Sequence, residues 1–168
     1  MNTPVTGPIV LAPTDLSQAS VGATTFAADL AQNMKGTLVL LKVVLPREVE
    51  DGLAQGKFVD QQIDEGRAYL RWWLTTFVPA DARQRIQVRE LVAVGHPQDE
   101  IPAVAESLHA TMIVMATHAR SGFRRAVLGS VAEAVLRRAP CPVVMLRGAG
   151  QTWATARPEA VPVGAAIA

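Results

Sequence analysis

The segment from residue 111 to residue 147 constrains the fold most strongly, because two short apolar runs flank a loop and a helical pattern. The first run, residues 111–115, is too short for a helix and is rich in branched residues, as in a buried strand. After a polar loop, apolar residues recur at helical spacing: Val131, Ala134, Val135 and Ala139. The second run, residues 143–146, predicts another strand. A strand, a helix and a strand in this order predict the crossover of a parallel sheet.

Polar and cationic groups surround the start of this predicted helix. Ser130 is expected to be its N-cap, and Pro140 and Pro142 to end it. The preceding loop, residues 116–125, carries three arginines: Arg120, Arg124 and Arg125. A helix N-terminus offers N–H groups and a partial positive charge, so these groups together could hold a phosphate chain. The alternative is a solvated basic loop that only turns the chain.

The same segment resembles the nucleotide loop of the universal stress protein family. That family's pattern is Gly, two residues, Gly, nine residues, Gly, then Ser or Thr; residues 116–119, nine further residues and Gly129-Ser130 match its spacing. The flanks also resemble the family, namely residues 120–123, 129–133 and 139–143. The similarity covers roughly residues 8–147. The chain departs from the pattern at Ala116 and Ala119, where the family has glycine.

Strand and helix patterns alternate along the rest of the chain. We expect three further strands at 9–12, 37–44 and 86–93 and three further helices at 17–33, 58–78 and 97–108. A loop is expected at residues 45–56, between strand 37–44 and helix 58–78, because it contains Pro46, Gly52 and Gly56. The alternation predicts an α/β fold, a doubly wound five-stranded parallel sheet of order 3-2-1-4-5 with helices on both faces. Strand 86–93 alternates polar and apolar residues, as an edge strand does.

Composition narrows the class of protein. A chain of 168 residues with 49% apolar residues and a net charge of +1 is expected to be globular, with one domain at residues 1–147. Residues 148–168 are rich in Gly, Ala and Pro and are expected to form a flexible tail. The charge balance predicts no nucleic-acid partner. Neither a signal peptide nor a membrane-spanning run is predicted, and Cys141 alone forms no internal disulfide, so a cytoplasmic location is expected. Cys141 is interpreted as a small buried hydrophobe rather than a nucleophile.

A ligand site is expected where the strand order reverses, between the first and fourth strands. The two loops that meet there are Pro13-Thr14-Asp15 and residues 116–125. Asp15 could accept hydrogen bonds from a ribose hydroxyl or an adenine amino group. The alternative role for Asp15 is to cap the helix that follows it.

The resemblance implies which residues would bind a nucleotide. In nucleotide-binding family members, the residues matching Pro13, Thr14, Asp15 and Val43 lie against the base. Those that line the ribose and phosphates match Met115, Ala116, Ala119, Gly129, Ser130 and Val131. His118 and Arg120 complete the predicted set. The implied function is a stress-response sensor or signalling protein that binds ATP or a related adenine nucleotide, with Mg²⁺ considered as its companion ion.

A second hypothesis is that the chain has the same fold but binds no nucleotide. A family member without nucleotide binding would act through dimerisation and protein contacts, and strand 143–146, an apolar edge, is expected to pair two copies in a homodimer. An alanine at Ala119 would cost about 1 kcal/mol if the loop needs a positive φ there, whereas Ala116, beside a strand, is expected to have a negative φ. Enzyme motifs are lacking, and His118 has no partner acid in sequence, so at most slow incidental nucleotide hydrolysis is expected.

Overall fold

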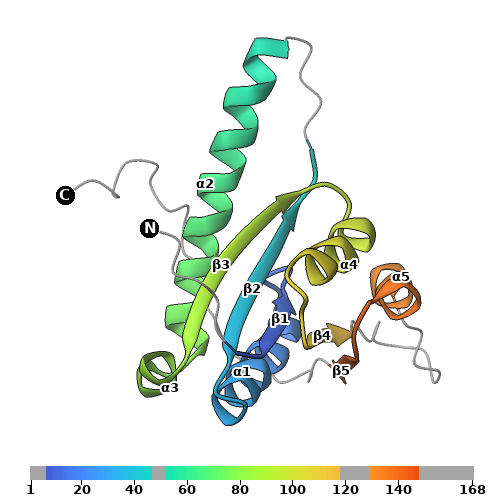
Figure 1. The fold of residues 1–168 in the computed structure, drawn as a ribbon. Helices are drawn as coiled ribbons and strands as arrows, with labels where there is room; N and C mark the ends of the chain where they lie inside the picture. Colours follow the sequence, from blue (N-terminus) through green and yellow to red (C-terminus); the bar gives the residue numbers. More distant parts are fainter. Residues whose placement is uncertain (1–6, 47–51, 118–128, 148–168) are drawn as a thin grey trace.

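The computed structural model describes residues 7–46, 52–117 and 129–147. Its strands form one parallel sheet in the order β3-β2-β1-β4-β5. They are β1 (Ile9–Pro13), β2 (Thr37–Val44), β3 (Gln87–Val94), β4 (Met112–Thr117) and β5 (Val143–Arg147). The predicted fold class and strand order are confirmed (Figure 1).

Helices cover both faces of the sheet, as the doubly wound pattern predicts (Figure 1). They are α1 (Gln18–Asn33), α2 (Gly52–Phe77), α3 (Ala80–Arg85), α4 (Pro97–Ser107) and α5 (Ser130–Arg138). Side chains alternate along each strand, so each strand contributes to two separate cores. In β2, Leu38 and Leu40 pack with α1, α2 and α3, whereas Val39 and Leu41 pack with α4 and α5.

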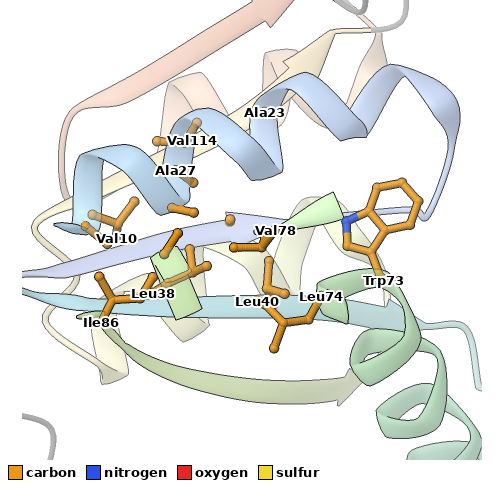
Figure 2. Packing of buried hydrophobic residues seen from close by; sticks show 14 of the residues in the cluster. Val10, Ala23, Ala27, Leu38, Leu40, Trp73, Leu74, Val78, Ile86 and Val114 are labelled. Atoms are coloured by element: carbon orange, nitrogen blue, oxygen red, sulfur yellow. The ribbon is translucent and has the colours of Figure 1, made fainter. Parts of the chain in front are cut away.

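The core under α1 and α2 contains the bulkiest side chain. Figure 2 shows Trp73 of α2 at one end of a layer that includes Ala23 and Ala27 of α1 and Leu40 of β2. Trp73 is 2% exposed, and its ring centroid lies 4.4 Å from that of Phe77. Trp73 therefore belongs to the core, and Phe77 packs against it.

The end of α1 requires a glycine for close approach. Lys35 adopts a positive φ of 51°, and Gly36 donates its N–H to the Ala31 carbonyl oxygen at 2.9 Å, which together close the last helical turn. A Cβ on Gly36 would collide with the carbonyl oxygen of Pro8, which precedes β1. The tight turn therefore brings the start of β2 against the start of β1, where the Thr37 N–H bonds the Pro8 carbonyl oxygen.

Two helices differ from the sequence prediction. α2 begins at Gly52 rather than at residue 58, so the predicted loop at 45–56 was wrong over its second half. Figure 1 shows this helix rising beyond the carboxyl ends of β2 and β3. The part of the helix that extends past the sheet does not pack on a core. Its sequence therefore lacks the apolar periodicity that would predict a helix. α3 was missed because its six residues are too few to show a period.

Smaller differences concern element ends. β4 spans residues 112–117 instead of the predicted 111–115, and β3 begins and ends one residue later than expected. The predicted tail, residues 148–168, lies outside the described residues. Within the described part, no helix is both long and apolar enough to cross a membrane.

Candidate functional site

A cleft of about 640 Å³ opens at the switch point of the sheet. Its lining comes from the carboxyl ends of β1, β2 and β4, the loop after β1, and the N-terminal residues of α4 and α5. The lining residues are Pro13, Thr14, Asp15, Ser20, Leu41, Val43, Pro97, Ile101, Met115, Ala116, Gly129, Ser130, Val131 and Ala132. A cleft of this size at this place accommodates a ligand the size of a nucleotide. The prediction that Asp15 and Gly129-Ser130 lie on the same cleft is confirmed.

The loop between β1 and α1 is held by its own side chains. Asp15 Oδ1 accepts the Ser17 N–H at 3.0 Å and the Ser20 hydroxyl at 2.7 Å. Thr14 Oγ1 accepts the Leu16 N–H at 3.0 Å, which supports a positive φ of 61° at Leu16. Asp15 therefore closes the turn that precedes α1 and lies on the cleft, but it is not the N-cap, so the alternative that it caps this helix was wrong. Ser17 holds the N-cap position without a side-chain capping bond.

At the end of β2, a peptide group faces the cleft. The last residue of β1 that pairs with β2 is Pro13, opposite Leu41, and the Leu41 carbonyl oxygen accepts the Thr14 N–H at 2.8 Å. β2 continues beside β3 as far as Val44, whose carbonyl oxygen accepts the Gly95 N–H at 2.9 Å. Because backbone groups alternate sides along a strand, the N–H and C=O of Val43 point toward the β1 side, beyond the end of β1. Val43 also lines the cleft.

At the opposite end of the cleft lies the start of α5. Gly129 is its N-cap, with φ −63° and ψ 155°, and makes no side-chain capping bond, so the prediction that Ser130 is the N-cap was wrong. Ser130 is instead the first helical residue. The first N–H groups of any α-helix lack partners within the helix. Among the described residues, no atom lies within 4 Å of a Cβ built on Gly129, and its φ is negative.

The two alanines of the nucleotide-loop pattern differ in what the structure says of them. Ala116 lies inside β4, opposite Leu146 of β5, and is 9% exposed. It has the extended backbone of a strand, so the expectation of a negative φ is confirmed. Ala119 and the predicted contacts beside it lie outside the described residues, namely His118, Arg120, Arg124 and Arg125.

Five lining residues were not predicted from the sequence: Ser20, Leu41, Pro97, Ile101 and Ala132. A signal existed for two of them. Leu41 lies two residues before Val43 and therefore on the same face of β2, and Ala132 follows Val131 in the first turn of α5. Pro97 and Ile101 line the cleft because α4 starts at the carboxyl end of β3. Ser20 enters through its bond to Asp15.

The Lys42 side chain projects from the face of β2 opposite to Leu41 and Val43, which line the cleft. Burial lowers the pKa of Lys42 below its ordinary value of 10.5, and the negative charge of Asp15 opposes that shift.

A charged contact joins the two helices on the cleft side. Arg138 of α5 donates to the Asp99 carboxylate and, at 3.3 Å, to the Gln98 carbonyl oxygen, both in the first turn of α4. Both charged side chains are about half exposed, so the pair contributes little stability by itself. It links the helices whose N-termini line the cleft.

Neither a metal centre nor an activated thiol is visible in the described ranges. No group of three His, Cys, Asp or Glu residues there could hold a metal ion. Burial raises the pKa of the Cys141 thiol, which makes it less reactive at neutral pH. Cys141 packs at the edge of the core under α4 and α5, consistent with its interpretation as a small hydrophobe.

Comparison with known proteins agrees with this geometry. The model of the universal stress protein family matches residues 8–147. The chain belongs to the universal stress protein family. A universal stress protein of Methanocaldococcus jannaschii is 39% identical over 62 residues, which cover 37% of this chain and 36% of that protein. A second protein of that organism is 31% identical over 61 residues, or 38% of its length. The matched segments thus span little more than a third of these relatives.

Solved structures of the family share the fold over most of this chain. The structure of UspA from Lactobacillus plantarum has a TM-score of 0.66 at 23% identity, covering 83% of this chain and 97% of that one. A universal stress protein from Archaeoglobus fulgidus gives 0.63 at 25% identity, covering 83% and 98%. The fold that this chain shares with these structures therefore includes all five strands, β1 to β5.

Proposed function

We propose that this universal stress protein binds an adenine nucleotide, ATP or a close relative, in the cleft between β1 and β4 and acts as a sensor or signalling module. One observation carries the proposal: a single cleft joins the Asp15 loop and the Val43 peptide at one end to the start of α5 at the other. The Asp15 loop and the Val43 peptide suit a nucleoside, and the start of α5 suits phosphates. Two family members of known structure are described in complex with cAMP and, from Archaeoglobus fulgidus, with dAMP, both adenine nucleotides.

The base would lie against the peptide of Val43. A backbone N–H beside a backbone C=O matches adenine, whose N1 accepts and whose 6-amino group donates. Guanine presents the reverse order at those atoms, so the same peptide would reject it. Apolar side chains of the cleft provide flat packing for a purine ring: Leu41, Val43, Ile101 and Met115.

The phosphates would lie at the start of α5. Four consecutive residues from Gly129 to Ala132 line the cleft there. Unpaired N–H groups and the positive end of the helix dipole favour a phosphate at such a place. The open space beside Gly129 leaves room for a phosphate to approach the backbone. Because the described residues hold no metal-ligand cluster, Mg²⁺ would arrive on the phosphates themselves.

The proposal assigns binding and no catalysis. Asp15 carries two hydrogen bonds from the start of α1, an arrangement suited to holding a ligand hydroxyl or amino group. The part of the cleft lining that the structure describes contains no cysteine, histidine or lysine to act as nucleophile or base. We therefore assign to this site ligand retention, with slow hydrolysis of ATP as an incidental reaction.

A glycine pair tests the phosphate end. Gly129→Ala adds one methyl group inside the cleft, where the backbone conformation accepts it without strain, so we expect affinity for ATP to fall about tenfold. Gly22→Ala is the matched control, because Gly22 is an exposed glycine of α1 whose added Cβ also meets no atom within 4 Å. Titration calorimetry with ATP, AMP and GTP measures both variants and the wild type.

The outcomes separate the two family hypotheses. Retained adenine nucleotide in the purified protein, or calorimetric binding of ATP that exceeds binding of GTP, supports the proposal. If the wild type binds no adenine nucleotide at millimolar concentration, the second candidate remains: a homologue that acts through dimerisation and protein contacts. That candidate is favoured by one feature: Asp15 Oδ1 already accepts hydrogen bonds from Ser17 and Ser20.

We also propose a homodimer that pairs β5 with β5 of a second copy. β5 is an edge of the sheet, and its residues from Val143 to Leu146 are partly buried apolar side chains. Such edges are covered or paired in stable proteins. Light scattering at micromolar concentration should give twice the chain mass, and Met145→Lys should give the chain mass. A monomeric wild type would contradict the dimer.

A further inference from the structure

A chain of hydrogen bonds runs from the α2 core to the cleft. Trp73 Nε1 donates to Thr24 Oγ1 at 2.9 Å, and the Thr24 hydroxyl donates to the Ser20 carbonyl oxygen at 3.0 Å. The Ser20 hydroxyl then donates to Asp15 Oδ1 at 2.7 Å. Trp73 and Thr24 are each 2% exposed and Ser20 is 4% exposed, whereas Asp15 is exposed. The chain therefore begins in a dry core and ends on the ligand side.

Ser20 is the member of this chain that touches both environments. It lines the cleft, yet it sits on the buried face of α1 with its carbonyl held by Thr24. A buried hydroxyl held in one place gives a short, charge-assisted bond to a carboxylate. An exposed carboxylate without that bond would sample more rotamers, and a ligand would lose affinity by ordering it.

We propose that Ser20 is a positioning residue for the nucleotide: it fixes the carboxylate of Asp15 in the orientation that meets the nucleoside. This inference rests on the proposed function and deepens it, because it adds to the cleft a residue that acts through Asp15. Thr24 and Trp73 support Ser20 and do not reach the cleft lining. The wall that carries Asp15 is thereby tied to the core under α2.

Removal of the hydroxyl separates positioning from stability. Ser20 lies in the first turn of α1, where alanine is a better helix former, and its N–H bond to the Ser17 carbonyl oxygen survives the substitution. In Ser20→Ala, Asp15 Oδ1 keeps the Ser17 N–H. We therefore expect a folded protein with an unchanged melting temperature and affinity for ATP lowered about fivefold to tenfold. Adenosine should lose the same factor, because Asp15 lies at the nucleoside end.

A double-mutant cycle in the full chain tests the route through Asp15. Calorimetry with ATP compares wild type, Ser20→Ala, Asp15→Ala and the double variant; the double variant should bind no more weakly than Asp15→Ala. Thr25→Ala is the matched control, because it removes another hydroxyl of α1 that bonds the Val21 and Gly22 carbonyl oxygens, and it should bind like wild type.

Each outcome decides between the inference and the proposed function. If wild type binds ATP and Ser20→Ala binds equally well, Ser20 does not position Asp15. Additive losses in the double variant would also overturn the inference, because Ser20 would then act without Asp15. If Ser20→Ala melts several degrees lower, Ser20→Cys, which keeps the volume and weakens the donor, must still lose affinity. Failure of wild type to bind either ATP or adenosine removes the proposed function itself.

Discussion

The two ends of the cleft are built in opposite ways. At the β1–α1 end, side chains satisfy the turn: Asp15 and Thr14 accept backbone N–H groups, and Ser20 holds Asp15 from the core. At the α5 end, Gly129 is the N-cap and has no side chain, and no described atom lies within 4 Å of a Cβ built on it. One end is organised before a ligand arrives, and the other leaves its N–H groups to a ligand or to water.

This difference separates two kinds of selectivity. A preorganised end recognises the shape and hydrogen-bond pattern of a nucleoside, because its groups lose little freedom on binding. An uncapped helix start recognises negative charge with little regard to shape. Loss of the Asp15 carboxylate at the first end should therefore change both stability and affinity, whereas Gly129→Ala at the second end should change affinity alone.

The largest expected effect is at the core behind the preorganised end. Trp73→Ala removes the bulkiest buried side chain and leaves Thr24 Oγ1 without its donor, so unfolding free energy should fall by about 3–5 kcal/mol. Leu136→Ala, on the exposed side of α5, is the control and should change stability by less than about 0.5 kcal/mol. Chemical denaturation followed by circular dichroism measures both. Equal losses of unfolding free energy in the two variants would show that the core does not stabilise one end of the cleft more than the other.

The loop alanines test the phosphate end. If Ala119 holds backbone away from the phosphates, Ala119→Gly should tighten ATP binding up to about tenfold, or about 1.4 kcal/mol. Ala116→Gly is the control: Ala116 is already extended within β4, so affinity should change little while stability falls by about 0.5–1 kcal/mol. Calorimetry with ATP measures both variants. A wild type that binds tightly and an Ala119→Gly that binds equally would show a negative φ at Ala119.

Loss of the Asp15 carboxylate should have a smaller effect on stability. Asp15→Ala removes the acceptor for the Ser17 N–H and the Ser20 hydroxyl, so we expect a loss of about 1 kcal/mol in unfolding free energy. Asp15→Asn keeps an oxygen acceptor and should recover most of that loss. Both variants should bind adenosine more weakly than wild type. Unchanged stability in Asp15→Ala would contradict this stabilising role and leave only the ligand role.

The smallest expected effect is the pH dependence due to Lys42. The pKa of Lys42 is lower in the folded protein than the 10.5 of the unfolded chain, chiefly because of burial. Between those two values the unfolded chain binds more protons, so wild-type stability should rise with pH through that window, and the contribution should be lost as pH falls below the folded pKa. Lys42→Met should lack this rise. Urea unfolding at several alkaline pH values up to 10.5 compares the two, and identical slopes would contradict the assignment.

The order of elements could be predicted because each strand of a doubly wound sheet is a short apolar run and each helix has an apolar stripe. β2 was predicted with its observed bounds, and the edge position of β3 followed from its alternation. The start of α2 could not be predicted, because the part that rises beyond the sheet needs no apolar stripe (Figure 1). α3 is shorter than two helical turns and has no detectable period.

The cleft could be predicted in outline from the same pattern. The switch point places the loop after β1 beside the loop after β4 in any sheet of this order, and Asp15 and Gly129 therefore had to meet. Val43 was implied by the family resemblance, and Leu41, which was missed, lies on the same face of β2 by alternation. Gly129 as N-cap could not be predicted, because Ser130 is the better capping residue by type and only the backbone path decides between neighbours.

The sequence alone determined the family, the strand order and the residues that face each core, because these depend on periodic patterns and on a motif with fixed spacing. Only the tertiary structure decided that Ser17 rather than Asp15 is the N-cap of α1, and that the Ser20 hydroxyl bonds Asp15. Trp73 and Thr24 are 49 residues apart in the chain, and no local pattern predicts their hydrogen bond. Such contacts arise from how α1 and α2 pack on one sheet face, and packing depends on the whole set of buried side chains rather than on any one segment.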